Sequence, residues 1–178
     1  MHPHLTHVFS LLDASRVQVK AAVDTVPENR RRERPAPDRW SVAEIIEHVA
    51  LVERRFTGVV AVAIAKARDA GLAQETSART PFPQEHAHRV LDRSVQRTAP
   101  EMVQPTGSMD VSSAWTAFDE AGAGLRDAVS AADGLALSAV TSDHHIWGPL
   151  NVYQWVELAA GHELRHADQI REIAALWT

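Results

Sequence analysis

Two histidines near the C-terminal end of the sequence, His162 and His166, have the spacing of a ligand pair. Residues four apart share one face of an α-helix, so the two imidazole rings would lie one above the other. Apolar residues recur on the same side of this segment, which makes it the side that faces the core. Imidazole nitrogens in an apolar core need partners, and either hydrogen-bonding neighbours or a divalent metal ion can supply them. The pair alone is compatible with both interpretations.

A third histidine, His48, projects from the apolar side of a different segment. It lies three residues after Ile45 and four before Val52. A single histidine at such a position is more often structural, but three inward-facing histidines on two helices favour a metal site. Two ligands from one helix and one from a facing helix define a triangle around an ion and leave positions open to water or substrate. We therefore predict that His48, His162 and His166 bind one divalent transition metal ion.

Residues 162–166, with the sequence HELRH, also match the HExxH signature of zinc proteases, in which Glu163 would be the general base. The residues that follow lack the glycine and the third histidine of the metzincin extension, and no strand is evident to hold an extended peptide. We therefore do not expect a protease. Glu163 remains the candidate catalytic residue for proton transfer, and Glu44, one helical turn before His48, is a second candidate.

The composition restricts the classes of function. The 178 residues include ten histidines and no cysteine, so disulfides, thiolate ligands and a protein thiol nucleophile are excluded. The formal net charge of -5 argues against a nucleic-acid partner. No signal peptide and no membrane-spanning segment is evident, so no membrane partner is expected and the predicted location is cytoplasmic.

Four segments with helical periodicity must position these histidines: residues 4–26, 41–68, 110–131 and 150–176. The second begins at a capping box, Ser41 with Glu44, and the third at the capping residue Asp110. No segment alternates as a strand does. We predict an all-α fold in one domain over residues 1–178: a four-helix bundle whose long crossover, residues 71–109, joins the second and third main helices and contains a short helix near residues 84–96.

Three stretches resemble the DinB/YfiT-like superfamily. Residues 40–48, WSVAEIIEH, are similar to the WSxxExxxH opening of the family's second helix. Residues 148–155, GPLNVYQW, and 162–170, HELRHADQI, are similar to its last helix with the ending HxxxHxxQI. The order and spacing of the helices also agree, so the resemblance extends over nearly the whole chain.

The resemblance implies a four-helix bundle, often dimeric, in which His48, His162 and His166 hold the metal, with zinc or nickel as the usual ion. Some relatives are transferases or isomerases that use a low-molecular-weight thiol, such as bacillithiol or mycothiol. A thiol cosubstrate suits a chain that has no thiol of its own. We expect a metal-dependent enzyme of this kind with a small-molecule substrate, and a homodimer formed through the first helix. A metal-dependent hydrolase and a non-catalytic, metal-stabilised binding module are the alternatives.

The remaining polar residues near these motifs receive simpler interpretations. His144 and His145 are expected in a solvated loop before the fourth helix. Arg165 and Asp168 fall outside the inner stripe, where surface pairs or contacts behind the ligands are expected. Gln169, three residues after His166, is expected to orient the ring of that histidine.

Overall fold

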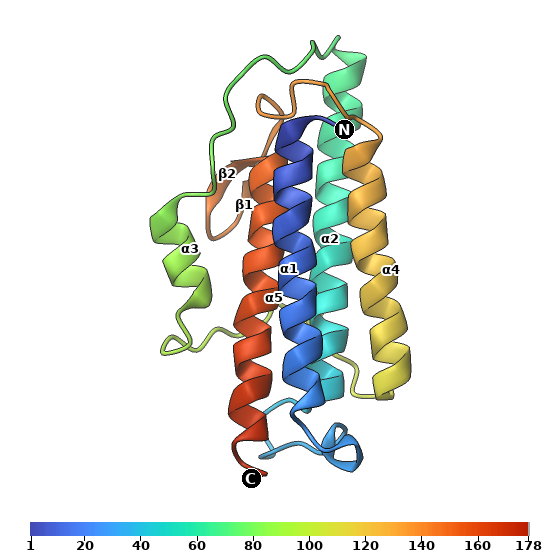
Figure 1. Cartoon of the computed structure of the whole chain (residues 1–178), viewed down its shortest axis with the longest axis vertical. Helices are drawn as coiled ribbons and strands as arrows, with labels where there is room; N and C mark the ends of the chain where they lie inside the picture. The colour runs from blue at the N-terminus through green and yellow to red at the C-terminus, as the bar shows by residue number, and fades with distance from the viewer. Residues whose placement is uncertain (178) are drawn as a thin grey trace.

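The computed structural model describes residues 1–177, and most of them are helical (Figure 1). Four of the helices within residues 1–177 are long: α1, α2, α4 and α5. They lie side by side along the longest axis, with α1 and α5 running in one direction and α2 and α4 in the other. The elements, in chain order, are α1 (Pro3–Asp24), η1 (Glu28–Arg30), α2 (Val42–Asp69), α3 (Gln84–Leu91), η2 (Glu101–Val103), α4 (Val111–Ser130), β1 (Thr141–His144), β2 (Gly148–Asn151) and α5 (Val152–Ala174). The prediction of a mostly helical protein is confirmed.

Side chains at the helix starts define where the helices begin. Ser41 and Glu44 form the predicted capping box of α2, with each side chain bonded to the other residue's backbone N–H. The Asp110 side chain accepts a hydrogen bond from the Ser113 N–H at the start of α4, as predicted. A second capping box, Asn151 with Gln154, starts α5 at residue 152 rather than 150.

The core consists of two apolar clusters, one at each end of the long helices. The first involves the N-terminal half of α1, the C-terminal half of α2 and the N-terminal half of α5. The second involves the opposite halves of these helices together with the N-terminal half of α4. Polar residues lie between the clusters: Ser15, Arg16, Glu53, Glu163 and the three predicted metal ligands. A polar layer therefore crosses the middle of the molecule.

A short hairpin corrects the expectation that the chain contains no strand. β1 and β2 pair antiparallel, with Thr141 opposite Asn151 and His144 opposite Gly148. Each strand has four residues, too few for period-two alternation to be visible, and proline is uncommon within strands, yet Pro149 lies in β2. Contacts of β1 with α2 and of β2 with α5 support the hairpin.

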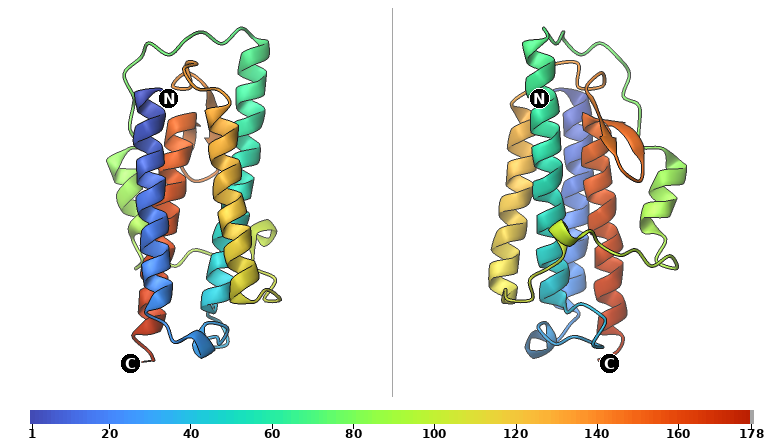
Figure 2. Two further views of the ribbon diagram at one scale, coloured as in Figure 1. Left: turned by 45° about the vertical axis from the view of Figure 1, so that its right-hand side comes forward. Right: turned by 180° about the vertical axis from the view of Figure 1, so that it is seen from behind.

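The connection from α2 to α4 lies on the outside of α5 and α2 (Figure 2). Its helix α3 packs on α5, and its short helix η2 packs on α2. α3 ends at Leu91, five residues earlier than expected. Arg165, expected to make a surface pair or a contact behind the ligands, is instead buried beneath this connection. It donates hydrogen bonds to three backbone carbonyls at the end of α3 and just after it: those of Val90, Asp92 and Val95.

Within residues 1–177, no helix is both long enough and apolar enough to cross a membrane.

Candidate metal centre

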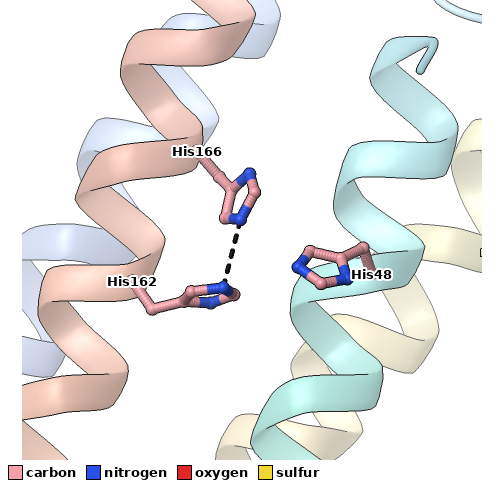
Figure 3. Close-up of side chains that lie close together, drawn as sticks. All are labelled: His48, His162 and His166. Carbon is pink, nitrogen blue, oxygen red and sulfur yellow. Dashed lines mark hydrogen bonds between the residues drawn. The ribbon is translucent and has the colours of Figure 1, made fainter. Parts of the chain in front are cut away.

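His48, His162 and His166 converge between α2 and α5 (Figure 3). One ring nitrogen from each lies within 4.8 Å of the other two. Nε2 of His166 is 3.1 Å from Nε2 of His162, and the ring of His48 faces both across the space between the helices. The three side chains predicted as ligands therefore form a compact triad, and their nitrogens are close enough for a single ion to bind them all.

The packing of α2 against α5 brings the triad together. His162 and His166 occupy successive turns of one face of α5, and His48 lies on the face of α2 that is directed toward them. His48 and His166 are buried and His162 is half-buried. The triad thus lies inside the molecule, with His162 less deeply buried than the other two histidines.

Hydrogen bonds on the far side of two rings fix their orientation. Nδ1–H of His48 donates to the backbone carbonyl of Val103 over 2.7 Å, and Nδ1–H of His166 donates to the side-chain oxygen of Gln169 over 2.8 Å. A carbonyl oxygen can only accept, so Nδ1 carries the proton and each Nε2 presents a lone pair. The predicted role of Gln169 is confirmed. The role of the Val103 carbonyl could not be predicted from the sequence, because every residue has a backbone carbonyl.

The third ring, His162, is incompletely satisfied by the protein. Its Nε2 shares a hydrogen bond with Nε2 of His166, and its Nδ1 is a buried nitrogen without a partner among residues 1–177. An unsatisfied buried polar atom costs about 1–3 kcal/mol. His48 and His166 therefore each present an Nε2 lone pair, and His162 has one nitrogen without a partner. Three such imidazoles fit a divalent ion such as zinc or nickel.

The electrostatic environment keeps all three rings neutral. Burial lowers the pKa of His48. Burial, together with the neighbouring histidines and Arg165, lowers the pKa of His162 and of His166 well below the ordinary value. Neutral imidazole is the form that binds metal ions, so the triad is in its ligand state at neutral pH.

A comparison with protein families establishes the relationship. The family model of the DinB superfamily matches residues 11–170, a range that includes all three histidines of the triad. The chain belongs to the DinB superfamily. The resemblance noted in the sequence is therefore confirmed. A comparison with curated proteins finds no match.

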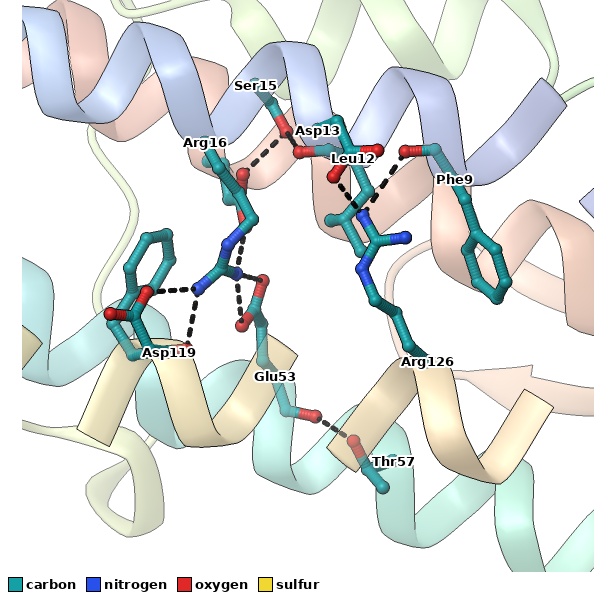
Figure 4. A network of polar contacts seen from close by, with 11 residues as sticks. Phe9, Leu12, Asp13, Ser15, Arg16, Glu53, Thr57, Asp119 and Arg126 are labelled. Atoms are coloured by element: carbon teal, nitrogen blue, oxygen red, sulfur yellow. Dashed lines mark hydrogen bonds and ion pairs between the residues drawn. The ribbon is translucent and has the colours of Figure 1, made fainter. Parts of the chain in front are cut away.

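Glu163 in this DinB chain is directed away from the triad. It accepts hydrogen bonds from Ser15 Oγ over 2.5 Å and from Arg16 Nη1 over 3.0 Å, both on α1. Arg16 also pairs with the buried Glu53 and the exposed Asp119 (Figure 4). Burial, followed by the neighbouring Glu53, raises the pKa of Glu163 to about 10. This placement offers no support for proton transfer at the triad.

Glu44, the second candidate for proton transfer, is also engaged elsewhere. Its carboxylate accepts hydrogen bonds from Arg34 and from the Ser41 N–H of the capping box. These bonds outweigh burial and lower the pKa of Glu44. Neither candidate carboxylate belongs to the group of ligand atoms that lie within 4.8 Å of one another in residues 1–177.

His144, expected in a solvated loop, lies in β1 and packs against the core. Its ring centroid is 5.2 Å from that of Trp155 and 6.0 Å from that of Phe56. Burial, followed by the neighbouring His145 and Arg55, lowers the pKa of His144 to about 4. His145 is exposed, as expected. Sequence patterns did not reveal His144, because its burial depends on the hairpin.

Proposed function

We propose that this DinB-superfamily protein binds one divalent transition metal ion, zinc or nickel, through His48, His162 and His166. We further propose that it uses this ion to activate a low-molecular-weight thiol for transfer to, or isomerisation of, a small-molecule substrate. The observation that supports the proposal most directly is the convergence of the three ring nitrogens within 4.8 Å of one another. The four long helices are then the four-helix bundle of the family, and the connection from α2 to α4 is its long crossover.

The donor set suits an activating centre. Three protein ligands leave at least one coordination position open, as in catalytic zinc sites. A divalent ion held there would lower the pKa of a bound water or thiol. The residues of the chain have supporting tasks: the Val103 carbonyl and Gln169 orient two rings, and burial keeps the imidazoles neutral. Since the chain has no cysteine, the thiol is supplied as a cosubstrate.

Metal binding is tested on untagged, metal-depleted protein. Titration with Zn²⁺ and with Ni²⁺, followed by elemental analysis, should give one ion per chain, and the ion should raise the melting temperature. His48→Ala and His166→Ala should abolish binding. His7→Gln, which removes an exposed histidine of α1, is the matched control and should leave binding unchanged. Retention of the ion by both alanine variants would refute the site.

Activity is tested with the metal-loaded protein, a panel of small thiols and electrophilic acceptors. Thiol-dependent turnover that disappears in His48→Ala supports the transferase or isomerase. Turnover of esters or amides in the absence of any thiol would contradict the thiol-dependent activity and indicate a hydrolase instead. A bound ion that stabilises the protein but accepts no thiol or other external ligand would indicate a structural module.

The homodimer stays a prediction. The apolar stripe of α1 packs against α5 inside the chain, so a dimer formed through α1 would use its outer side, where Leu11 and Val17 are exposed. Light scattering of the purified protein measures the molecular mass directly, and a monomer mass would contradict the prediction.

A further inference from the structure

Two arginines act on the rings of the triad, although the chain carries a net charge of -5. After burial, the neighbours that act most strongly on the rings of His162 and His166 are histidines and arginines, among them Arg165 and Arg93. Arg165 is occupied by three backbone carbonyls, and Arg93 pairs with Glu172 at 2.8 Å. These two cations therefore contribute a positive potential but have few donors left for a ligand.

Arg55 is a cation close to the triad that remains available. It is seven residues after His48 in α2, which places it on nearly the same helix face, two turns or about 10 Å along the axis. The short helix η2 links the two residues, because Val103 accepts the hydrogen bond from His48 while the adjacent Met102 contacts the Arg55 guanidinium through its sulfur. Arg55 therefore lies at the edge of the same α2 face.

The guanidinium of Arg55 has no carboxylate partner among residues 1–177, and its hydrogen bond within that range is to the Met102 sulfur. Its neighbour Arg54, by contrast, pairs with Glu120 at 3.0 Å. Arg55 also lines a groove between α2 and β1 whose charged lining side chains are Arg54, Arg55 and Lys66. Arg55 is exposed, so its donors can reach a ligand that enters from this side.

His144 supplies a second donor at the same level of the molecule. It contacts Trp155, which precedes His162 by seven residues and therefore lies two turns away on the same face of α5. Nδ1 of His144 accepts a hydrogen bond from the Ile146 N–H, so the neutral ring carries its proton on Nε2. No acceptor for this Nε2–H is present in residues 1–177.

Apolar side chains occupy the intervening turn. Leu51 and Val52 of α2 follow His48 by three and four residues, and Leu158 of α5 precedes His162 by four. A ligand that binds the metal at one end and reaches the level of Arg55 at the other would therefore pass these apolar side chains. Its far end would meet two hydrogen-bond donors of the protein, Arg55 and His144.

We propose that Arg55 and His144 form an anion subsite of the metal centre, which holds the carboxylate or similar acidic group of an elongated small molecule whose other end reaches the histidine triad. The inference rests on the proposed function and adds the class of ligand: an organic acid with an apolar middle of roughly 10 Å or less. The Arg55 guanidinium donates to the acid in a charge-assisted pair, and Nε2–H of His144 donates a second hydrogen bond.

The test uses Co²⁺-loaded protein, because thiolate binding to Co²⁺ gives a near-ultraviolet absorption band. Mercaptohexanoate and mercaptohexanol have the same thiol and chain and differ in charge. The acid should bind roughly tenfold more tightly than the alcohol, as one charge-assisted hydrogen bond predicts. Arg55→Gln should remove this preference and leave the affinity for the alcohol unchanged. Arg54→Gln, the adjacent and paired arginine, should preserve the preference.

The outcomes separate the two proposals. Equal affinities of the wild-type protein for acid and alcohol, or a preference that survives in Arg55→Gln, would overturn the subsite while the metal centre and thiol binding stand. A spectrum that neither thiol changes would overturn thiol activation. In that case hexanoate, which has no thiol, tests the subsite separately. Hexanoate should shift the NMR resonances of the His144 ring in the wild-type protein and not in Arg55→Gln. The absence of a shift in the wild-type protein would refute the subsite.

Discussion

Nδ1–H of His166 donates a hydrogen bond to the side-chain oxygen of Gln169 over 2.8 Å, while Nε2 of the same ring lies 3.1 Å from Nε2 of His162. A residue one turn further along α5 thus determines which nitrogen of His166 faces the triad. The Val103 carbonyl has the same role for His48 from a different part of the chain. The ligand geometry therefore depends on groups that do not themselves approach the ion.

Replacement of Gln169 by leucine should weaken metal binding without removing a ligand. The ring of His166 loses its acceptor and can rotate or change tautomer, so the affinity should fall roughly 10- to 100-fold. Competition against a chromophoric chelator measures the dissociation constant. Gln96→Leu, at an exposed position in the connection, is the control and should have wild-type affinity. Wild-type affinity in Gln169→Leu would show that the hydrogen bond does not orient the ligand.

Glu163→Gln tests the role predicted for this residue in proton transfer. Because the carboxylate is bonded to Ser15 and Arg16 and is directed away from the triad, the variant should bind metal within about threefold of the wild type. Its turnover in the thiol assay should also stay close to the wild-type rate. A large loss of turnover with intact metal binding and stability would instead restore Glu163 as a catalytic residue.

Arg16 holds two buried carboxylates, Glu53 and Glu163, at 3.2 and 3.0 Å. Arg16→Leu leaves these acids without a cation, which should lower the free energy of unfolding by about 3–5 kcal/mol at neutral pH. Arg126→Leu removes the neighbouring arginine, whose partner Asp13 is largely exposed, and should cost about 1 kcal/mol or less. Urea denaturation followed by circular dichroism compares the two. Equal losses would contradict the buried network.

Two glycines of α4 should respond in opposite directions to alanine. A Cβ at Gly122 would collide with the Arg16 guanidinium, whereas a Cβ at Gly124 would meet no atom within 4 Å apart from its chain neighbours and the backbone of its own helix. Gly124→Ala should stabilise the protein by about 0.5–1 kcal/mol through helix propensity. Gly122→Ala should destabilise it despite the same propensity gain. Thermal melting of both variants checks the signs, and stabilisation by both would exclude close packing at Gly122.

His144 should stay neutral well below pH 6.5. Burial, then His145 and Arg55, lower its pKa to about 4 in the folded protein, while the unfolded chain has the ordinary value of 6.5. The unfolded state therefore binds more protons between these values, so stability is complete above pH 6.5 and decreases as the pH falls toward 4. Ring chemical shifts followed by NMR measure the pKa directly.

Arg55→Gln should raise the pKa of His144, because one of the positive charges that lower it is removed. Arg54→Gln keeps Arg55 in place and should leave the titration unchanged. A His144 ring that titrates near 6.5 in the wild-type protein would contradict the packing of β1 against Phe56 and Trp155.

Several features of the site were readable from local sequence, because helix geometry acts over a few residues. The four-residue spacing of His162 and His166 places both rings on one face, and the apolar neighbours of His48 place it on an inner face. The caps at Ser41 and Asp110 and the orienting role of Gln169 also depend on residues three or fewer positions apart. The sequence by itself therefore determined the ligand candidates and the helices that carry them.

Only the tertiary structure decided what each of these faces meets. The packing of α2 against α5 brings His48 opposite the other two rings, and the connection places the Val103 carbonyl behind it. Glu163 is one residue from a ligand, yet the 100° rotation per residue directs it to Arg16 on α1. Periodicity specifies which side of a helix is buried but not its partner, because the partner comes from segments tens of residues away.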